Sequence, residues 1–72
     1  MDTVYVEMVY TNMHFTDIGK CYRKKEDAIK RLRQLKQEHE ATCNHYSEEY
    51  MFVSYYVRKD RVEVDFEARI LR

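Results

Sequence analysis

The chain has 72 residues, of which 44% are hydrophobic and 36% charged, and its 13 basic and 13 acidic residues give a formal net charge of zero. A chain of this length forms one domain, residues 1–72, near the lower size limit for independent folding. The balanced charge argues against strong non-specific attraction to nucleic acid, and no apolar run reaches the roughly 18 residues of a membrane helix.

Residues 3–11 predict the first strand. Val4, Val6 and Met8 fall at alternate positions, which is the period of a strand. Val9 adds an apolar side chain to the other face, which indicates a strand that is central in its sheet or covered on both sides. A turn-rich segment at residues 12–17 then leads to a short second strand at residues 18–23.

A helix is predicted to begin near Lys24 or Lys25. Acidic residues in its first turn favour the positive end of the helix dipole. Apolar residues recur at helical spacing and form the stripe expected to be buried: Ala28, Ile29, Leu32 and Leu35. We expect the helix to fray between residues 40 and 44, and residues 44–49 to form a polar connection.

Residues 61–70 alternate between apolar and charged side chains with almost no fault, which predicts a strand with one dry face. If Lys59 and Asp60 form a two-residue hairpin loop, all the apolar side chains of two neighbouring strands share one face. That register pairs Arg58 with Arg61, Val57 with Val62, Tyr55 with Val64, Val53 with Phe66 and Met51 with Ala68.

The predicted fold is α+β: an antiparallel sheet of about four strands with one helix packed on one face, in the order β-β-α-β-β. The expected core comes from the dry faces of these elements: Val4, Val6, Met8, Ala28, Ile29, Leu32, Leu35, Met51, Val53, Tyr55, Val57, Val62, Val64, Phe66 and Ala68. One helix covers only one face, so the other face must meet solvent or a partner.

Aromatic side chains are expected on that uncovered face and are the predicted partner-binding residues: Tyr5, Tyr50, Phe52 and Tyr56. Aromatics are enriched at the anchors of protein interfaces, but strands favour them in any case, so an ordinary solvated face explains them equally well. The acidic residues expected opposite them would repel a phosphate backbone, which argues against base stacking on this face.

The helix start offers a second kind of site, because residues 20–36 are strongly basic. Its alternative nucleic-acid-binding residues are Lys30, Arg31, Arg33 and Lys36. The ordinary interpretation is a solvated helix face, and no glycine-rich loop accompanies the basic residues to hold a nucleotide.

A third alternative is a small metal-binding module built from His39, Cys43 and His45. His39 and Cys43 are four residues apart and would share a helix face, but the paired short spacing of zinc modules is missing. Cys21 has no residue that would activate it as a nucleophile. We therefore expect no cofactor, no metal and no enzymatic activity.

Two stretches, residues 4–10 and residues 18–32, resemble a pattern of small uncharacterised bacterial and phage α+β proteins, in which a short strand leads directly into a helix. The resemblance implies a phage-type setting and no particular activity.

The sequence therefore predicts a small non-enzymatic protein that binds a macromolecular partner, most simply another protein, with host modulation by a phage accessory protein as its most concrete form. A chain this small gains from association, so a homodimer is expected as an alternative to a protein partner. The two cysteines form no disulfide framework, and the chain opens without a signal segment, so we expect a soluble cytoplasmic protein without a membrane partner.

Overall fold

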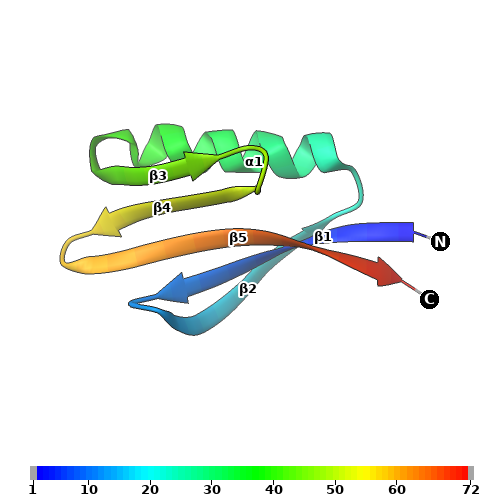
Figure 1. Ribbon diagram of the computed structural model, residues 1–72, viewed down its shortest axis with the longest axis horizontal. Helices are drawn as coiled ribbons and strands as arrows, with labels where there is room; N and C mark the ends of the chain where they lie inside the picture. Colours follow the sequence, from blue (N-terminus) through cyan, green and yellow to red (C-terminus); the bar gives the residue numbers. More distant parts are fainter. Residues whose placement is uncertain (1, 72) are drawn as a thin grey trace.

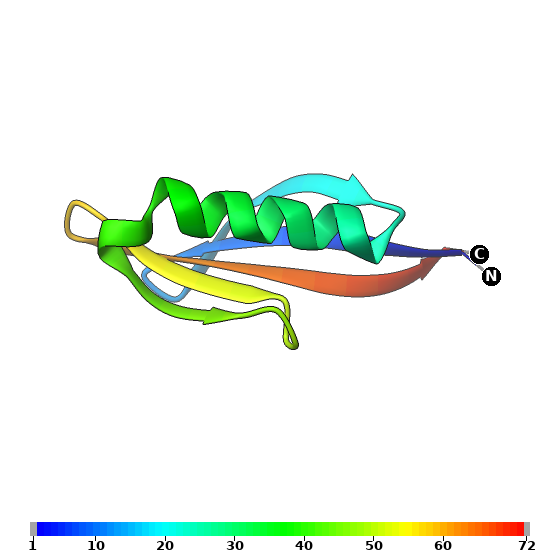
Figure 2. The same ribbon diagram turned by 90° about the horizontal axis from the view of Figure 1, so that it is seen from above.

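The computed structural model describes residues 2–71 and consists of one helix and one antiparallel sheet (Figure 1). The elements in chain order are β1 (Asp2–Thr11), β2 (His14–Tyr22), α1 (Lys25–Glu38), a 3₁₀ turn η1 (Glu40–Thr42), β3 (Cys43–Ser47), β4 (Phe52–Val57) and β5 (Asp60–Leu71). The strand order in the sheet is β2-β1-β5-β4-β3, and α1 runs along one side of the sheet (Figure 2). Within residues 2–71, no helix is long and apolar enough to span a membrane.

The α+β class and the single helix are confirmed, together with the predicted β-β-α-β-β order, but the sheet has five strands and not about four. The additional strand, β3, lies where the sequence predicts a polar connection. Its residues Cys-Asn-His-Tyr-Ser show no apolar alternation, because a register shift between Cys43 and His45 brings Cys43 and Tyr46 to the same side of the sheet, where both pack against the core. Helix α1 ends at Glu38, earlier than the predicted fraying, and the His39 N–H closes it on the Leu35 carbonyl.

The β4–β5 hairpin is confirmed as an element, but its predicted register is wrong by two residues. Val57 pairs with Asp60, so the loop consists of Arg58 and Lys59, with Arg58 in the left-handed region at φ 59°. A shift of two keeps every side chain on its predicted face, because the side-chain period of a strand is two. Tyr55 therefore faces Val62 and Val53 faces Val64, still inside one apolar layer.

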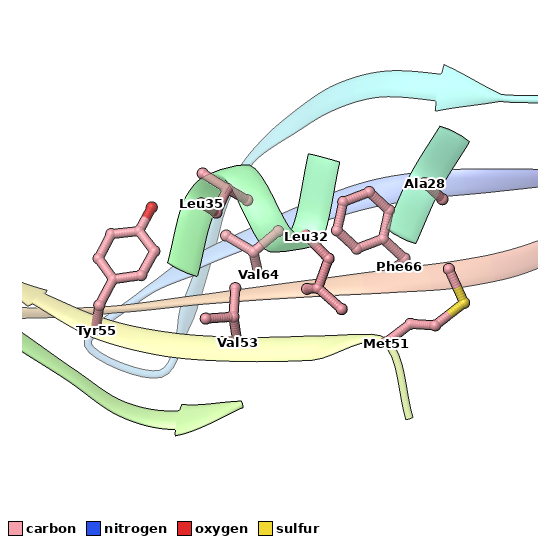
Figure 3. Packing of buried hydrophobic residues seen from close by; sticks show 8 residues of the cluster. All are labelled: Ala28, Leu32, Leu35, Met51, Val53, Tyr55, Val64 and Phe66. Atoms are coloured by element: carbon pink, nitrogen blue, oxygen red, sulfur yellow. The ribbon is translucent and has the colours of Figure 1, made fainter. Parts of the chain in front are cut away.

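The core lies between α1 and the middle of the sheet, where the side chains of the two layers point toward one another (Figure 3). The predicted residues that it buries are Ala28, Leu32, Leu35, Met51, Val53, Tyr55, Val64 and Phe66. Ile29 and Val62 are partly buried against it. Val57 and Ala68 are exposed, because they lie toward the ends of their strands, so their assignment to the core is wrong.

Strand β1 also differs from its prediction, because its two faces are exchanged. Glu7 pairs with Phe66 and Val9 pairs with Val64, and these partners face the helix. The alternate residues Val4, Val6 and Met8 consequently lie on the other face and outside the helix-side core, although Val4 is buried as predicted. The register against β5 decides the facing, and the sequence of β1 is apolar enough on both faces to accept either one.

Candidate partner-binding surface

The sheet face that α1 leaves uncovered, called the open face below, combines an apolar half with an acidic row. Cross-strand partners share a face, so the pairings define its members: Val4, Val6, Met8 and Tyr10 of β1; Phe15, Ile18 and Cys21 of β2; His45 and Ser47 of β3; Phe52, Ser54 and Tyr56 of β4; and Arg61, Glu63, Asp65, Glu67 and Arg69 of β5.

The apolar half of the open face lies on β1 and β2, and large side chains remain in solvent there. Phe15 is 51% exposed and Ile18 is 53% exposed, although each has a cross-strand partner on β1. The rings of Tyr10 and Phe15 pack edge to face with centroids 5.8 Å apart. Clustered exposed apolar residues of this kind are typical of interaction sites, whereas single ones are ordinary.

The acidic row lies on β5 beside the apolar half. Arg61 is 3.0 Å from Glu63, and Arg69 is 2.7 Å from Glu67, so each outer carboxylate has its own arginine on the same strand. Asp65 lies between them and forms no ion pair with any residue that the structure describes. Burial raises the pKa of its carboxyl group, and the negative charge of Glu67 raises it further.

Asp65 lies between two apolar neighbours. Its cross-strand partners are Met8 on β1 and Phe52 on β4, and all three side chains emerge on the open face. A hollow of about 250 Å³ opens beside them and is lined by Tyr10, Met13, Phe52, Arg61, Glu63 and Asp65. An unpaired carboxylate in a partly apolar hollow can accept a cation that brings its own apolar surface.

Met13 stands at the rim of this hollow in a backbone conformation that favours glycine. Asn12 and Met13 form the β1–β2 turn with φ values of 51° and 70°, and Met13 is 77% exposed. Two hydrogen bonds of the Asn12 side chain hold the turn. The Asn12 Nδ2 donates to the Asp60 carboxylate at 2.9 Å, and the Arg61 backbone N–H donates to the Asn12 Oδ1 at 3.0 Å. The exposed methionine is thus presented at a defined place despite its backbone strain.

The predicted aromatic residues are only partly brought together. Phe52 and Tyr56 lie on the open face, whereas Tyr50 lies in the β3–β4 turn and is 74% exposed. Tyr5 lies on the opposite face, packed against the helix-side core, because its cross-strand partner is Ala68 in the register that β5 imposes. Its placement on the uncovered face is therefore wrong.

Sequence reasoning missed four residues of this surface, Tyr10, Phe15 and Ile18 on the open face and Met13 in the adjoining turn, and it placed Asp65 on the uncovered face without giving it a role. The composition of residues 12–17 predicts a turn, yet β2 begins already at His14. The signal for an exposed site was the large apolar side chains Met13 and Phe15 in a stretch that otherwise looks like a turn. Asp65 showed no signal, because its isolation depends on the pairing of its two acidic neighbours.

The basic helix residues are largely engaged within the chain. Arg33 binds the Glu48 carboxylate through two nitrogens at 2.8 and 2.9 Å, and Lys36 lies over the Tyr46 ring, 4.7 Å from its centroid. The Arg31 Nε lies 3.6 Å from the carboxylate of Glu7. Only Lys30 of the predicted set has no such contact in the part of the chain that the structure describes, so the set offers little free positive charge to phosphates.

The Arg33–Glu48 contact predicts a loss of stability in acid. Hydrogen bonds from Arg33, and then from Tyr46, lower the pKa of Glu48 to about 2. Since this pKa lies below that of the unfolded chain, the contact stabilises the fold above the ordinary carboxyl pKa and fades as the pH falls toward 2. The wild type should melt above Glu48→Gln at pH 6, and the difference in Tm should vanish near pH 2. A difference that persists at pH 2 would contradict the ionic origin.

The three metal candidates do not converge. The His39 ring stacks on Tyr55 with centroids 3.8 Å apart, and Cys43 lies opposite Tyr55 on the helix side of β3. His45 pairs with Ser54 on the open face, beyond a bulge in β3. Residues 2–71 contain no group of three or more histidine, cysteine or acidic side chains that could hold a metal ion. Cys21 and Cys43 are free thiols on strands at opposite edges of the sheet.

Both edges of the sheet are irregular. The β1–β2 pairing has register shifts between Val6 and Met8 and between Val9 and Tyr10, and the Asp17 carboxylate accepts the N–H of Ile18. The β3–β4 pairing also has a register shift. Bulges, and backbone groups that are already hydrogen-bonded, hinder the pairing of an edge strand with another chain. The geometry therefore favours contact through the open face over edge-to-edge association.

Comparisons with protein-family models, with curated proteins and with solved structures found no match, so the fold and the open face carry the functional argument by themselves.

Proposed function

We propose that this chain is a non-enzymatic binding protein that uses its open face to hold a segment of another protein. The observation that carries the proposal is the half-exposed pair Phe15 and Ile18 on β2, on the same hairpin as Met13 with its strained turn and separated from the acidic row of β5 by the single strand β1. Protein-binding sites typically have apolar anchor residues at the centre and polar residues around them. The setting of a phage-type accessory protein stays a prediction.

A protein partner is favoured over nucleic acid by charge. The open face contains a row of three carboxylates and two arginines that are already paired, so it would repel phosphates. The basic residues lie on α1, and three of the four predicted ones contact other groups of the chain. Binding of nucleic acid through α1 would therefore require these three side chains to give up their contacts within the chain.

A different protein is favoured over a second copy for a related reason. In a symmetric dimer formed through the open faces, the acidic rows of the two copies would approach each other. The unpaired Asp65 of one copy would then lie near Asp65 of the second copy. Like charges opposed across an interface cost affinity. The homodimer stays a prediction that light scattering at several concentrations tests directly.

The proposal is tested with peptides selected from a random linear library against the wild-type protein. We expect binders whose affinity falls roughly tenfold or more in a Phe15→Ser, Ile18→Ser variant, because two interface anchors are lost. The matched control is Lys30→Ser on the exposed side of α1, which should leave binding unchanged. A library that yields no binder, or binders that depend on Lys30 and not on Phe15, would overturn the proposal.

Met13→Gly separates function from stability. Glycine tolerates the left-handed backbone at this position, so the variant should be more stable by about 1 kcal/mol and melt about 4–8 °C higher. The selected peptides should nevertheless bind it more weakly, because the exposed side chain at the rim of the hollow is gone. A variant that is more stable and binds equally well would show that Met13 has no part in binding.

A further inference from the structure

We propose that the hollow beside Asp65 receives a single lysine or arginine side chain of the partner, with its charge on the Asp65 carboxylate. This inference rests on the proposed function and names the partner chemistry: a segment that carries one basic residue among apolar ones. The hollow is lined by Tyr10, Met13, Phe52, Arg61, Glu63 and Asp65.

The charge argument starts from the pairing within the acidic row. Glu63 and Glu67 are each bound by an arginine of the same strand at 3.0 and 2.7 Å. Asp65 is left without a countercharge among residues 2–71, and its neighbours across the sheet are Met8 and Phe52. A carboxylate that is partly withdrawn from water and unpaired gains more from an incoming cation than one that is already neutralised.

The walls of the hollow fit the rest of a basic side chain. Lysine and arginine have an apolar stem below the charge, and Tyr10, Phe52 and Met13 offer apolar and aromatic surface for that stem. An aromatic ring beside the carboxylate adds cation–π attraction. The volume of about 250 Å³ admits one extended side chain and is too small for a folded element.

An anionic group is not accepted at the same place. Arg61 is the one cation that lines the hollow, and it is bound to Glu63. Burial raises the pKa of Asp65, and a bound cation would lower this pKa again because it stabilises the charged carboxylate. Asp65 is therefore the residue expected to set the charge preference of the open face.

Disulfide tethering tests the inference without a partner. A Met13→Cys variant, with Cys21→Ser and Cys43→Ala, places one thiol at the rim of the hollow. The protein is equilibrated with equal amounts of cystamine and bis(2-hydroxyethyl) disulfide. Cation-exchange chromatography separates the two adducts, which differ by one charge, and gives the ratio of amine to alcohol adducts. We expect this ratio to be about two- to fivefold higher than in the same variant carrying Asp65→Asn, and to fall with added salt.

The matched control is Glu67→Gln, which removes the same charge from the same row but not from the hollow, and it should leave the adduct ratio almost unchanged. Melting curves confirm that all variants are folded. Equal ratios with and without Asp65 would overturn the inference, and so would an equal loss in Glu67→Gln, which would indicate a diffuse field.

The tether and the peptide selection can fail separately. Peptides that need Phe15 but bind equally to wild type and Asp65→Asn would leave the proposed function standing and overturn the basic subsite. An amine preference at the thiol of the Met13→Cys variant without any selected binder would support the subsite and count against the proposed function. Self-association that disappears in Asp65→Asn would make a second copy the source of the cation and overturn the assignment to a different protein.

Discussion

Val64→Asp is expected to unfold the domain. Val64 is 1% exposed and lies in the middle strand of the sheet, paired with Val9 on one side and Val53 on the other. A carboxylate in this apolar layer has no countercharge and costs about 3–5 kcal/mol, to which the lost packing of the valine adds. A domain of this length has a total stability of about 4–11 kcal/mol, so the substitution should remove a large part of it or all of it. Far-ultraviolet circular dichroism during urea unfolding measures the effect.

The neighbouring substitution Glu63→Gln is the matched control for Val64→Asp. Glu63 points to the open face, and its loss removes only the partly exposed ion pair with Arg61, worth about 1 kcal/mol or less. The two substitutions are one position apart in the sequence, but Val64 faces the core and Glu63 faces the open side, so their effects on stability should differ strongly. If both melted alike, the assignment of faces along β5 would be wrong.

Gly19→Ala is expected to cost about 1–3 kcal/mol, although Gly19 is exposed and its φ is not positive. A Cβ atom at Gly19 would lie 2.8 Å from Cδ and 2.9 Å from Oε2 of Glu7. Glu7 is buried, with its side chain 9% exposed and Arg31 as its ion-pair partner at 3.6 Å. The added methyl group therefore displaces a buried carboxylate from its countercharge, which is expensive in a poorly solvated site.

A double-mutant cycle with Glu7→Ala identifies this cause. Glu7→Ala removes the atoms that the new Cβ would meet, so Gly19→Ala should cost almost nothing in that background. Replacement of an exposed residue on the other face of the same strand, Cys21→Ala, should change the free energy of unfolding by less than about 0.5 kcal/mol. An equal cost of Gly19→Ala in both backgrounds would rule out Glu7 as the reason.

Local patterns determined much of the fold. The helical spacing of Ala28, Leu32 and Leu35 and the alternation along β5 led directly to the α+β class, to a single helix on one face and to the greater part of the core. These patterns are reliable because each residue's facing follows from the periodicity of its own element. The same logic preserved the faces of β4 and β5 when the hairpin register proved to be shifted by two.

The tertiary structure decided what the periodicity left open. Strand β1 has apolar side chains on both faces, so only its pairing with β5 placed Glu7 and Val9 toward the helix and Met8 toward the open face. Strand β3 has no apolar alternation of its own, because a register shift in its pairing with β4 brings Cys43 and Tyr46 to the helix side.

The candidate site depends on the tertiary structure most of all. Asp65 is unpaired because its neighbours hold the two arginines of the strand, and its hollow is formed by residues from β1, the β1–β2 turn, β4 and β5. The sequence by itself determined that one sheet face would be left uncovered. Which side chains meet there was decided by the register between strands distant in the chain, because register is a property of pairs of strands and is written in neither strand alone.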